Sequence, residues 1–232
     1  MLGSDLAAAL EEIRLIRALR PPANTRTPQP ERYVYLRRRG DDVVVSRLPS
    51  AYGPLRRRSH AERAARALAG CSQDEFDQLL TGAPLMRLYE RLADLADCLR
   101  YEDAARLRDR IASVERVVDQ LGRLERLRRL EACILVPALE PHCSDAFFVC
   151  AGRIVARRTL PGDRSAEAEV DAALTLTTNA RTTGPSFDSE HLDELLVIDS
   201  FLKHPPPELR ILPLESSTIL AHQTARVARA AA

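Results

Sequence analysis

The residues best suited to binding phosphates are arginines gathered in one segment. Between Arg32 and Arg66 there are ten arginines and three acidic residues, whereas the whole chain of 232 residues has a formal net charge of only +1. Guanidinium groups bind phosphate oxygens, so this segment could lie along a nucleic-acid backbone. Lys203 is the only lysine, so a chain-wide bias toward arginine is the alternative explanation. The candidate contacts are Arg37, Arg38, Arg39, Arg56, Arg57 and Arg58.

Thiol and imidazole groups form a second set with possible chemistry. His142 and Cys143 are adjacent, and Cys133 and Cys150 lie nearby in the sequence, as they would for a metal site. The five cysteines are odd in number and include no Cys-x-x-Cys pair, which argues against a disulfide framework and against a zinc knuckle. Isolated buried thiols are commoner than such metal sites, and both interpretations stay open here.

The elements that must position these groups begin with a helix. Apolar residues recur at helical spacing from Leu6 to Ile16, after a capping Ser4 and before Pro21. Gly40 then separates two β-like runs, which indicates a β-hairpin. Two segments that begin with serine and end with glycine follow, and each predicts a short helix. The predicted strands cover residues 32–39 and 42–48, and the predicted helices cover residues 59–70 and 72–82.

Two apolar stripes form the most periodic part of the chain. From Leu85 to Leu99 the leucines step by three and four residues, and the positions from Leu107 to Leu121 do the same. Leu99 and Leu107 are eight residues apart, where one continuous stripe would repeat after seven. We therefore predict an antiparallel helical hairpin that turns near Arg100. We also expect Tyr101 to close the open end of this hairpin.

The last third of the sequence predicts a small α+β unit followed by a tail. Runs of β-branched and aromatic residues alternate with two helical patterns, and an alanine-rich stretch begins at Ser216. The predicted strands are residues 132–139, 145–152, 153–160 and 208–214, and the predicted helices are residues 166–176 and 189–201.

Composition limits the class of protein. There is no run of 18 apolar residues and no basic start leading into an apolar stretch, so we expect neither a membrane span nor a signal peptide, and we expect a cytoplasmic protein. Few aromatic residues and 15 prolines favour small modules over one large domain. The expected modules are residues 1–24, 31–83, 84–130 and 131–213, with a flexible tail over 214–232.

The stretch RYEDAARLRDRI, residues 100–111, carries a family resemblance. It is similar, nearly position by position, to the UVR motif shared by the UvrB and UvrC repair proteins, with Tyr101 where that family usually has Phe. The resemblance covers roughly residues 85–118 and implies that the hairpin packs against the UVR hairpin of a UvrB-type partner. An ordinary helical hairpin rich in Ala, Arg and Glu is the alternative. The residues implied in the contact are Leu99, Tyr101, Glu102, Ala104, Ala105, Leu107, Arg108, Asp109 and Ile111.

The first helix carries a second resemblance. LAAALEEIRLIRALRPPANT looks like the closing helix of the GIY-YIG endonuclease domain of UvrC, which implies that Glu12 binds one Mg²⁺ or Mn²⁺. That chemistry also needs two tyrosines and an arginine before the glutamate, and the eleven residues before Glu12 do not supply them. We expect a C-terminal part of a longer nuclease or a protein that has lost its catalytic module. Glu12 would then be catalytic only if the rest of that domain is supplied, and otherwise it is a solvated acid.

The order of segments agrees with UvrC-like proteins, with two departures. AYGPLRRRSHAERAARAL, residues 51–68, resembles the stretch that follows the nuclease domain. Only Cys71 precedes the hairpin where UvrC has four cysteines, so we expect no iron-sulfur cluster. The ribonuclease-H-like site of UvrC is not recognisable, and no function is carried over for residues 131–213. The acids and histidine available there are Asp171, Asp188, Asp193 and His191.

These patterns predict an α+β protein with a mainly helical N-terminal half, a β-hairpin, a UVR helical hairpin and a small C-terminal α+β unit. The resemblance implies a UvrC-like excision-repair protein that lacks most of its nuclease domain and binds a UvrB-like protein. Double-stranded DNA is a possible second partner, through the arginine-rich segment. The alternatives are a fragment or subunit of a metal-dependent endonuclease using Glu12, and a homodimer formed through the leucine stripes.

Overall fold

The computed structural model describes residues 3–19, 33–79, 83–184 and 191–230. The chain belongs to the α+β class, as predicted, and its described residues fall into two compact units. The described residues between 33 and 126 form one unit, which we call the hairpin unit. The described residues before and after this span form the other, which we call the sheet unit.

The hairpin unit begins with two antiparallel strands, β1 (Tyr35–Arg39) and β2 (Asp42–Ser46). Gly40 makes the turn between them with a positive φ of 62°, a conformation that favours glycine. Two helices follow, α2 (Arg58–Ala67) and α3 (Gln73–Asp77). The predicted β-hairpin is therefore confirmed, and both short helices are present. Ser72 caps α3 as predicted, but the N-cap of α2 is Arg57 and not the predicted Ser59. The last residues predicted for the second helix, 80–82, lie outside the described residues.

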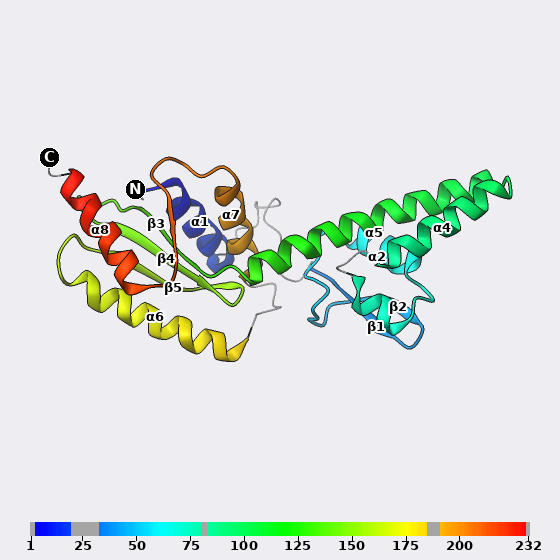
Figure 1. The fold of residues 1–232 in the computed structure, drawn as a ribbon, viewed down its shortest axis with the longest axis horizontal. Helices are drawn as coiled ribbons and strands as arrows, with labels where there is room; N and C mark the ends of the chain where they lie inside the picture. The colour runs from blue at the N-terminus through cyan, green and yellow to red at the C-terminus, as the bar shows by residue number, and fades with distance from the viewer. Residues whose placement is uncertain (1–2, 20–32, 80–82, 185–190, 231–232) are drawn as a thin grey trace. The chain divides into compact units, whose positions relative to one another are not determined.

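The predicted helical hairpin is also confirmed. It consists of α4 (Ala83–Asp97) and the longer α5 (Tyr101–Arg128), drawn in green in Figure 1. The α5 stripe is buried from Leu107 to Leu121, in one core with α2, β1 and Leu88 of α4. Both helices are amphipathic, so each is stabilised by packing this apolar face. The other apolar members of this core are Val34, Leu36, Val43, Leu55, Leu68, Phe76 and Leu79.

The sheet unit is built on a four-stranded antiparallel sheet with the strand order β5-β4-β3-β6. Helices α1 and α7 cover one face of this sheet, and α6 and α8 cover the other (Figure 1). Every residue of β4 is buried, which explains why that strand reads as a nearly continuous apolar run. The strands are β3 (Ala132–Pro137), β4 (Ser144–Cys150), β5 (Arg153–Leu160) and β6 (Arg210–Leu212). The helices are α1 (Asp5–Leu19), α6 (Ala166–Thr183), α7 (Leu192–Lys203) and α8 (Ser216–Ala230).

Alternate side chains of the central strands serve the two faces. Ile134 of β3 and Phe147 of β4 point toward α1 and α7, whereas Leu135 and Phe148 point toward α6 and α8. This alternation follows from the period of two along a strand. The sheet is therefore the middle layer of three.

Two expectations about the chain ends differ from the structure. The tail over residues 214–232 was expected to be flexible, but it contains α8, where Ile219 and Gln223 are buried one turn apart. Gln223 donates hydrogen bonds to the carbonyls of Leu160 and Pro161, at 2.9 and 3.2 Å, and so joins α8 to the end of β5. Residues 1–24 were expected to be a separate module. Instead, α1 buries Leu6, Ala7 and Leu10 in the sheet unit.

The described residues include no helix with both the length and the apolar character needed to cross a membrane. The longest helix, α5, carries charged side chains throughout its length.

A pair of glycine substitutions tests the packing of the hairpin unit. Gly122 lies inside α5, where an added Cβ would meet only Arg126 Nη1 at 3.8 Å, so Gly122→Ala should raise the free energy of unfolding by about 0.5–1 kcal/mol. A Cβ on Gly53 would lie 2.5 Å from Cδ1 of Tyr35 and 3.0 Å from the Val34 carbonyl oxygen. Gly53→Ala should therefore lower it by about 1–3 kcal/mol. Urea unfolding followed by circular dichroism measures both, and two changes of the same sign would contradict this packing.

Candidate functional site

The turn between α4 and α5 is closed by two backbone hydrogen bonds. The N–H of Arg100 donates to the carbonyl of Leu95 at 2.8 Å, and the N–H of Leu99 donates to the carbonyl of Ala96 at 2.9 Å. This pair of bonds is the Schellman motif that ends many helices. The motif places Leu99 in the left-handed region, with φ 56°, at a position where glycine or asparagine is usual.

Two large apolar side chains are exposed at this turn. Leu99 is 69% exposed, and Tyr101, the first residue of α5, is 65% exposed. The expectation that Tyr101 closes the open end of the hairpin is therefore wrong, because a side chain that did so would be buried. Together these residues give the tip of the hairpin an apolar end, which we call the hairpin tip.

The rest of the predicted contact residues divide into two groups. Leu107 and Ile111 are buried in the core of the hairpin unit, so they hold the hairpin together and do not offer a surface to a partner. Ala104 and Ala105 are half-buried, which leaves part of each small side chain accessible. Glu102 is exposed and pairs with Arg106 at 3.7 Å. The list implied by the resemblance thus mixes packing residues with surface residues.

Arg108 and Asp109 are the charged members of the motif. Both are exposed, and neither side chain makes an ion pair or hydrogen bond with any residue in the described part of the chain. Nearby charges do pair, as Arg100 with Asp103 at 2.7 Å. An arginine and an aspartate side by side, with opposite charges and no partner, are available to a facing surface of either sign.

Two exposed apolar residues of α4, away from the hairpin tip, were missed by the sequence reasoning. Met86 is 70% exposed and Tyr89 is 47% exposed, three residues apart on the outer side of α4. The Tyr89 hydroxyl donates a hydrogen bond to Glu115 of α5, and this bond raises the pKa of Tyr89. The signal that could have found them is their position outside the leucine stripe, because an apolar residue on the polar side of an amphipathic helix needs its own explanation.

Glu12 lies on the exposed side of α1. Its neighbour Glu11 is engaged instead, with Arg14 at 3.1 Å and Arg157 of β5 at 3.4 Å. In the ranges that the structure describes, no three His, Cys, Asp or Glu side chains gather as a metal ion would need. The binding of magnesium or manganese by Glu12 therefore stays a prediction that depends on residues from elsewhere.

The second proposed metal set is spread out in the same way. Cys133 and Cys150 are buried, Cys143 is half-buried, and His142 is exposed at the turn before β4. Burial raises the pKa of the Cys133 thiol to about 12. Such thiols stay protonated near neutral pH, which suits packing better than metal binding.

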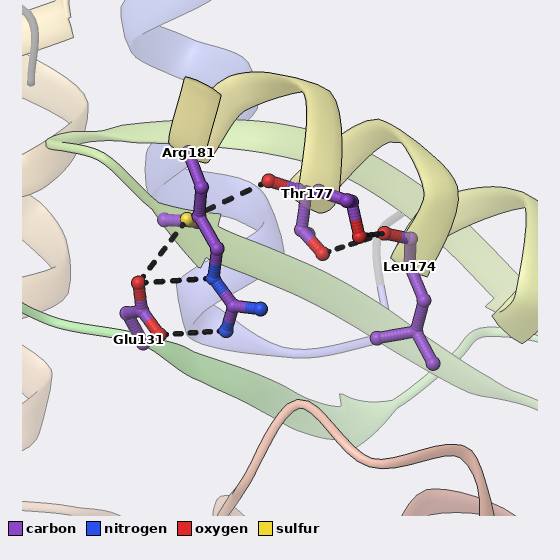
Figure 2. A network of polar contacts seen from close by, with 6 residues as sticks. Glu131, Leu174, Thr177 and Arg181 are labelled. Atoms are coloured by element: carbon purple, nitrogen blue, oxygen red, sulfur yellow. Dashed lines mark hydrogen bonds and ion pairs between the residues drawn. The ribbon is translucent and has the colours of Figure 1, made fainter. Parts of the chain in front are cut away.

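Cys150 belongs to a polar network that joins α6 to the start of β3 (Figure 2). Arg181 donates two hydrogen bonds to the Glu131 carboxylate, at 3.1 and 2.6 Å. The Cys150 thiol lies 3.7 Å from Glu131 Oε1 and 3.9 Å from the Thr177 carbonyl oxygen, and Thr177 in turn donates to the Leu174 carbonyl at 2.8 Å. Burial raises the pKa of the Cys150 thiol. The hydrogen bonds that the Glu131 carboxylate accepts from Arg181 lower the pKa of Glu131. The network is thus built to hold α6 in place and contains no activated nucleophile.

The remaining acids do not converge. Asp171 on α6 accepts a hydrogen bond from Ser216 at 2.9 Å, whereas Asp193 is buried in α7, on the opposite face of the sheet. His191 directly precedes α7, and Asp188 lies outside the described residues. These side chains come from different faces, so they do not form one nuclease centre among the described residues.

The predicted phosphate contacts are only partly available. Arg38 bonds the Gly40 carbonyl at 2.6 Å and Asp41 at 3.4 Å, and Arg58 bonds Glu62 at 2.8 Å. Arg37, Arg39 and Arg57 are exposed and pair with no acid among the described residues. Arg56 is exposed as well.

Comparisons of this chain with protein-family models, with curated proteins and with solved structures found no match. The two family resemblances drawn from the sequence therefore stay predictions. At the hairpin tip, packing within the described residues does not account for the exposed Leu99 and Tyr101.

Removing the partner of Glu131 gives a pH-dependent prediction. Because the folded-state pKa of Glu131 lies below its unfolded value, the pair with Arg181 stabilises the protein above the unfolded pKa, and this contribution is lost as the pH falls through the folded pKa. Arg181→Gln should lower the melting temperature at about pH 7 and have little effect at about pH 3. Both side chains are nearly half exposed, so the loss should not exceed about 1 kcal/mol.

The matched control for this measurement is Arg164→Gln, which removes an exposed arginine between β5 and α6. Thermal unfolding of both variants and the parent protein is followed across the pH range. An equal loss for Arg181→Gln at both ends of the range would show that the carboxylate of Glu131 is not the partner that matters.

Proposed function

We propose that the chain is a UvrC-like protein of nucleotide excision repair in the cytoplasm, and that its α4–α5 hairpin docks onto the UVR hairpin of a UvrB-type protein. The observation that carries the proposal is Leu99. This residue is a large apolar side chain held in a left-handed backbone conformation and left exposed at the hairpin tip.

Leu99 is a poor choice for folding alone. The left-handed conformation costs a residue with a Cβ about 1–2 kcal/mol, and glycine or asparagine would avoid most of that cost. Its side chain is 69% exposed, so it gains little hydrophobic stabilisation within the hairpin unit. A strained residue that contributes little to the fold is better explained by a contact that forms when a partner binds.

The surface around the hairpin tip suits another helical hairpin. Leu99 and Tyr101 supply an apolar centre, and Tyr is among the side chains that most often dominate binding energies. Arg108 and Asp109 add opposite charges that can select a partner carrying the complementary pair. The UVR resemblance names the partner class, because that motif is a device for pairing two such hairpins.

The nuclease alternative receives less support. A helix that normally packs on a nuclease sheet would need cover for its apolar side, but Leu6 and Leu10 are already covered by the sheet unit. Among the described residues, Glu12 belongs to no group of three or more His, Cys, Asp or Glu side chains that could hold a metal ion. The homodimer alternative was predicted through the leucine stripes, and Leu99 at the hairpin tip is the last leucine of the first stripe. The binding experiment must therefore include a measurement of mass in solution.

Substituting Leu99 separates docking from folding. Leu99→Asn removes the apolar side chain and keeps a residue that tolerates the left-handed conformation. We expect the free energy of unfolding to stay equal or to rise by about 1 kcal/mol, while the dissociation constant for a purified UvrB-type protein rises about fivefold or more. Isothermal titration calorimetry measures the affinity. Leu48→Asn, which changes an exposed leucine outside the hairpin, is the control and should leave it unchanged.

Unchanged affinity in Leu99→Asn would reject the hairpin tip as the docking site. Light scattering of the parent protein alone decides the homodimer alternative. A dimer that Leu99→Asn converts to a monomer would show that the tip binds a second copy of this chain.

The charged pair gives an independent test. The double variant Arg108→Asp with Asp109→Arg exchanges the two residues. The exchange keeps the composition and the net charge of α5, and both positions are exposed, but it reverses the order of the two charges along the helix. We expect weaker binding of the UvrB-type protein, with the far-ultraviolet circular dichroism spectrum unchanged. Arg164→Gln on the sheet unit is the control. Equal affinity after the exchange would mean that these charges do not face the partner.

The proposal includes a non-specific contact with double-stranded DNA through arginines of the hairpin unit. Arg37, Arg39 and Arg57 support it, because they are exposed without an acidic partner among the described residues. Arg38 and Arg58 support it less, since each is engaged by a nearby carboxylate.

A further inference from the structure

Arginines near the start of α2 and on one side of α5 lie around the same histidine, His60. His60 and Arg63 lie one turn apart on α2, and Arg57 directly precedes this helix as its N-cap residue. The neighbouring side of α2 is buried through Ala61 and Ala65. Arg57 and Arg63 are exposed and His60 is half-buried. The row is therefore an open surface and not part of the core.

A hydrogen bond brings α5 alongside this row. Gln120 Nε2 donates to the Pro54 carbonyl oxygen at 3.5 Å, and Pro54 lies in the loop that leads to Arg57. Arg116 is one turn from Gln120 on the same side of α5, and its side chain is exposed. The loop, α2 and α5 thus contribute one arginine each to a cluster around His60.

The electrostatic effect on His60 shows that this cluster is not neutralised. Partial burial lowers the pKa of His60, and repulsion from Arg63, Arg116 and Arg57 lowers it further. The strands β1 and β2 also pack against α2 but add no charge to this effect among the described residues. The imidazole is therefore mostly uncharged near neutral pH, and the surrounding field is positive.

The acidic residues near this cluster do not pair with its three arginines among the described contacts. Glu62 on α2 accepts a hydrogen bond from Arg58 at 2.8 Å, so it is held away from the row. Arg63 donates only to the Ser59 carbonyl oxygen, at 3.3 Å, among its described contacts. Asp119, one turn beyond Arg116, is exposed and contributes nothing to the pKa of His60. The three guanidinium groups keep their capacity to bind an anion.

We infer that Arg57, Arg63 and Arg116 form a binding surface for the phosphodiester backbone of double-stranded DNA, with His60 at its centre. This inference rests on the DNA contact proposed above and narrows it to three arginines, one of which lies outside the arginine-rich segment. The three arginine side chains are exposed to solvent, so a single small anion would stay largely hydrated beside them. Several phosphates bound at once would supply the affinity, as a nucleic-acid backbone does. Among the described residues, no Phe, Tyr or Trp side chain is part of the cluster, so we assign the contact to phosphates and not to bases.

Because His60 lies among the three arginines, its pKa can report whether DNA binds there. Phosphates that bind the three arginines reduce the positive field at the imidazole, so the pKa of His60 should rise in the complex. By linkage, binding takes up protons over the pH interval between the free and bound pKa values, and DNA affinity should increase as the pH falls through that interval. A site elsewhere on the unit would leave the titration of His60 unchanged.

The test measures binding of a short labelled DNA duplex by fluorescence anisotropy over a range of salt concentrations, using the full chain. Arg63→Gln and Arg116→Gln should each weaken binding and reduce the slope of log affinity against log salt by about 0.9. Arg91→Gln, on the exposed side of α4, is the control and should change neither quantity. Circular dichroism confirms that each variant is folded. Nuclear magnetic resonance titration of His60 should give a higher pKa with the duplex than without it.

The outcomes separate this inference from the proposal on which it rests. If Arg37→Gln weakens binding while Arg63→Gln and Arg116→Gln do not, the DNA contact stands and the location inferred here is wrong. If the parent protein does not bind the duplex, both fail. If heparin binds with the same dependence on Arg63 and Arg116 and the duplex does not, the surface is a general polyanion site and its assignment to DNA is overturned.

Discussion

The apolar stripe of α5 is the interaction on which the hairpin unit depends. Ile111, Val114 and Leu121 are buried, and each such side chain contributes about 1.5–3 kcal/mol when it leaves water. The same stripe serves α4, α2 and the β1–β2 hairpin, because all of them share one core. The shared core includes α5 from Leu107 to Leu121. Leu99 and Tyr101 precede this stretch, and their side chains are left in solvent.

The sheet unit follows from a different constraint. Its two central strands carry large apolar side chains on both faces, so both faces must be covered. Between Leu127 and Leu212, the described residues supply α6 and α7 for this purpose, one for each face. Helices from the two ends of the chain complete the layers, with Leu6 of α1 on one face and Ile219 of α8 on the other. The need to cover the sheet thus explains why the ends of the chain join the same unit.

The sequence was informative where the signal is local. The helical hairpin was predictable because the register of the leucines shifts between Leu99 and Leu107, and the strands were predictable from their β-branched and aromatic runs. The helix of the alanine-rich tail was missed because its fixing contacts, through Ile219 and Gln223, are made to residues distant in sequence. The pairing of Arg58 with Glu62 was within reach, since the two are four residues apart on a helix.

The residues of the candidate site were harder to predict, because a sequence motif does not distinguish the residues that pack inside from those that face solvent. Only the structure separates Leu107 and Ile111, which pack inside, from Arg108 and Asp109, which do not. The left-handed conformation of Leu99 also has no sequence signal, because leucine rarely adopts it. Arg116 was not predictable as a phosphate contact, since its place beside α2 depends on the packing of two helices far apart in the chain.

The two proposed surfaces depend on one helix and are still compatible with each other. Tyr101 begins α5 and Arg116 lies 15 residues further along, which separates them by roughly 22 Å along the helix axis. A second helical hairpin packed on the tip would therefore not cover the arginines around His60. Because α5 is a continuous helix between the two positions, partner and DNA would be held at a fixed spacing. A rigid spacer of this kind is what a protein needs if it is to place a bound repair partner at a set position on a duplex.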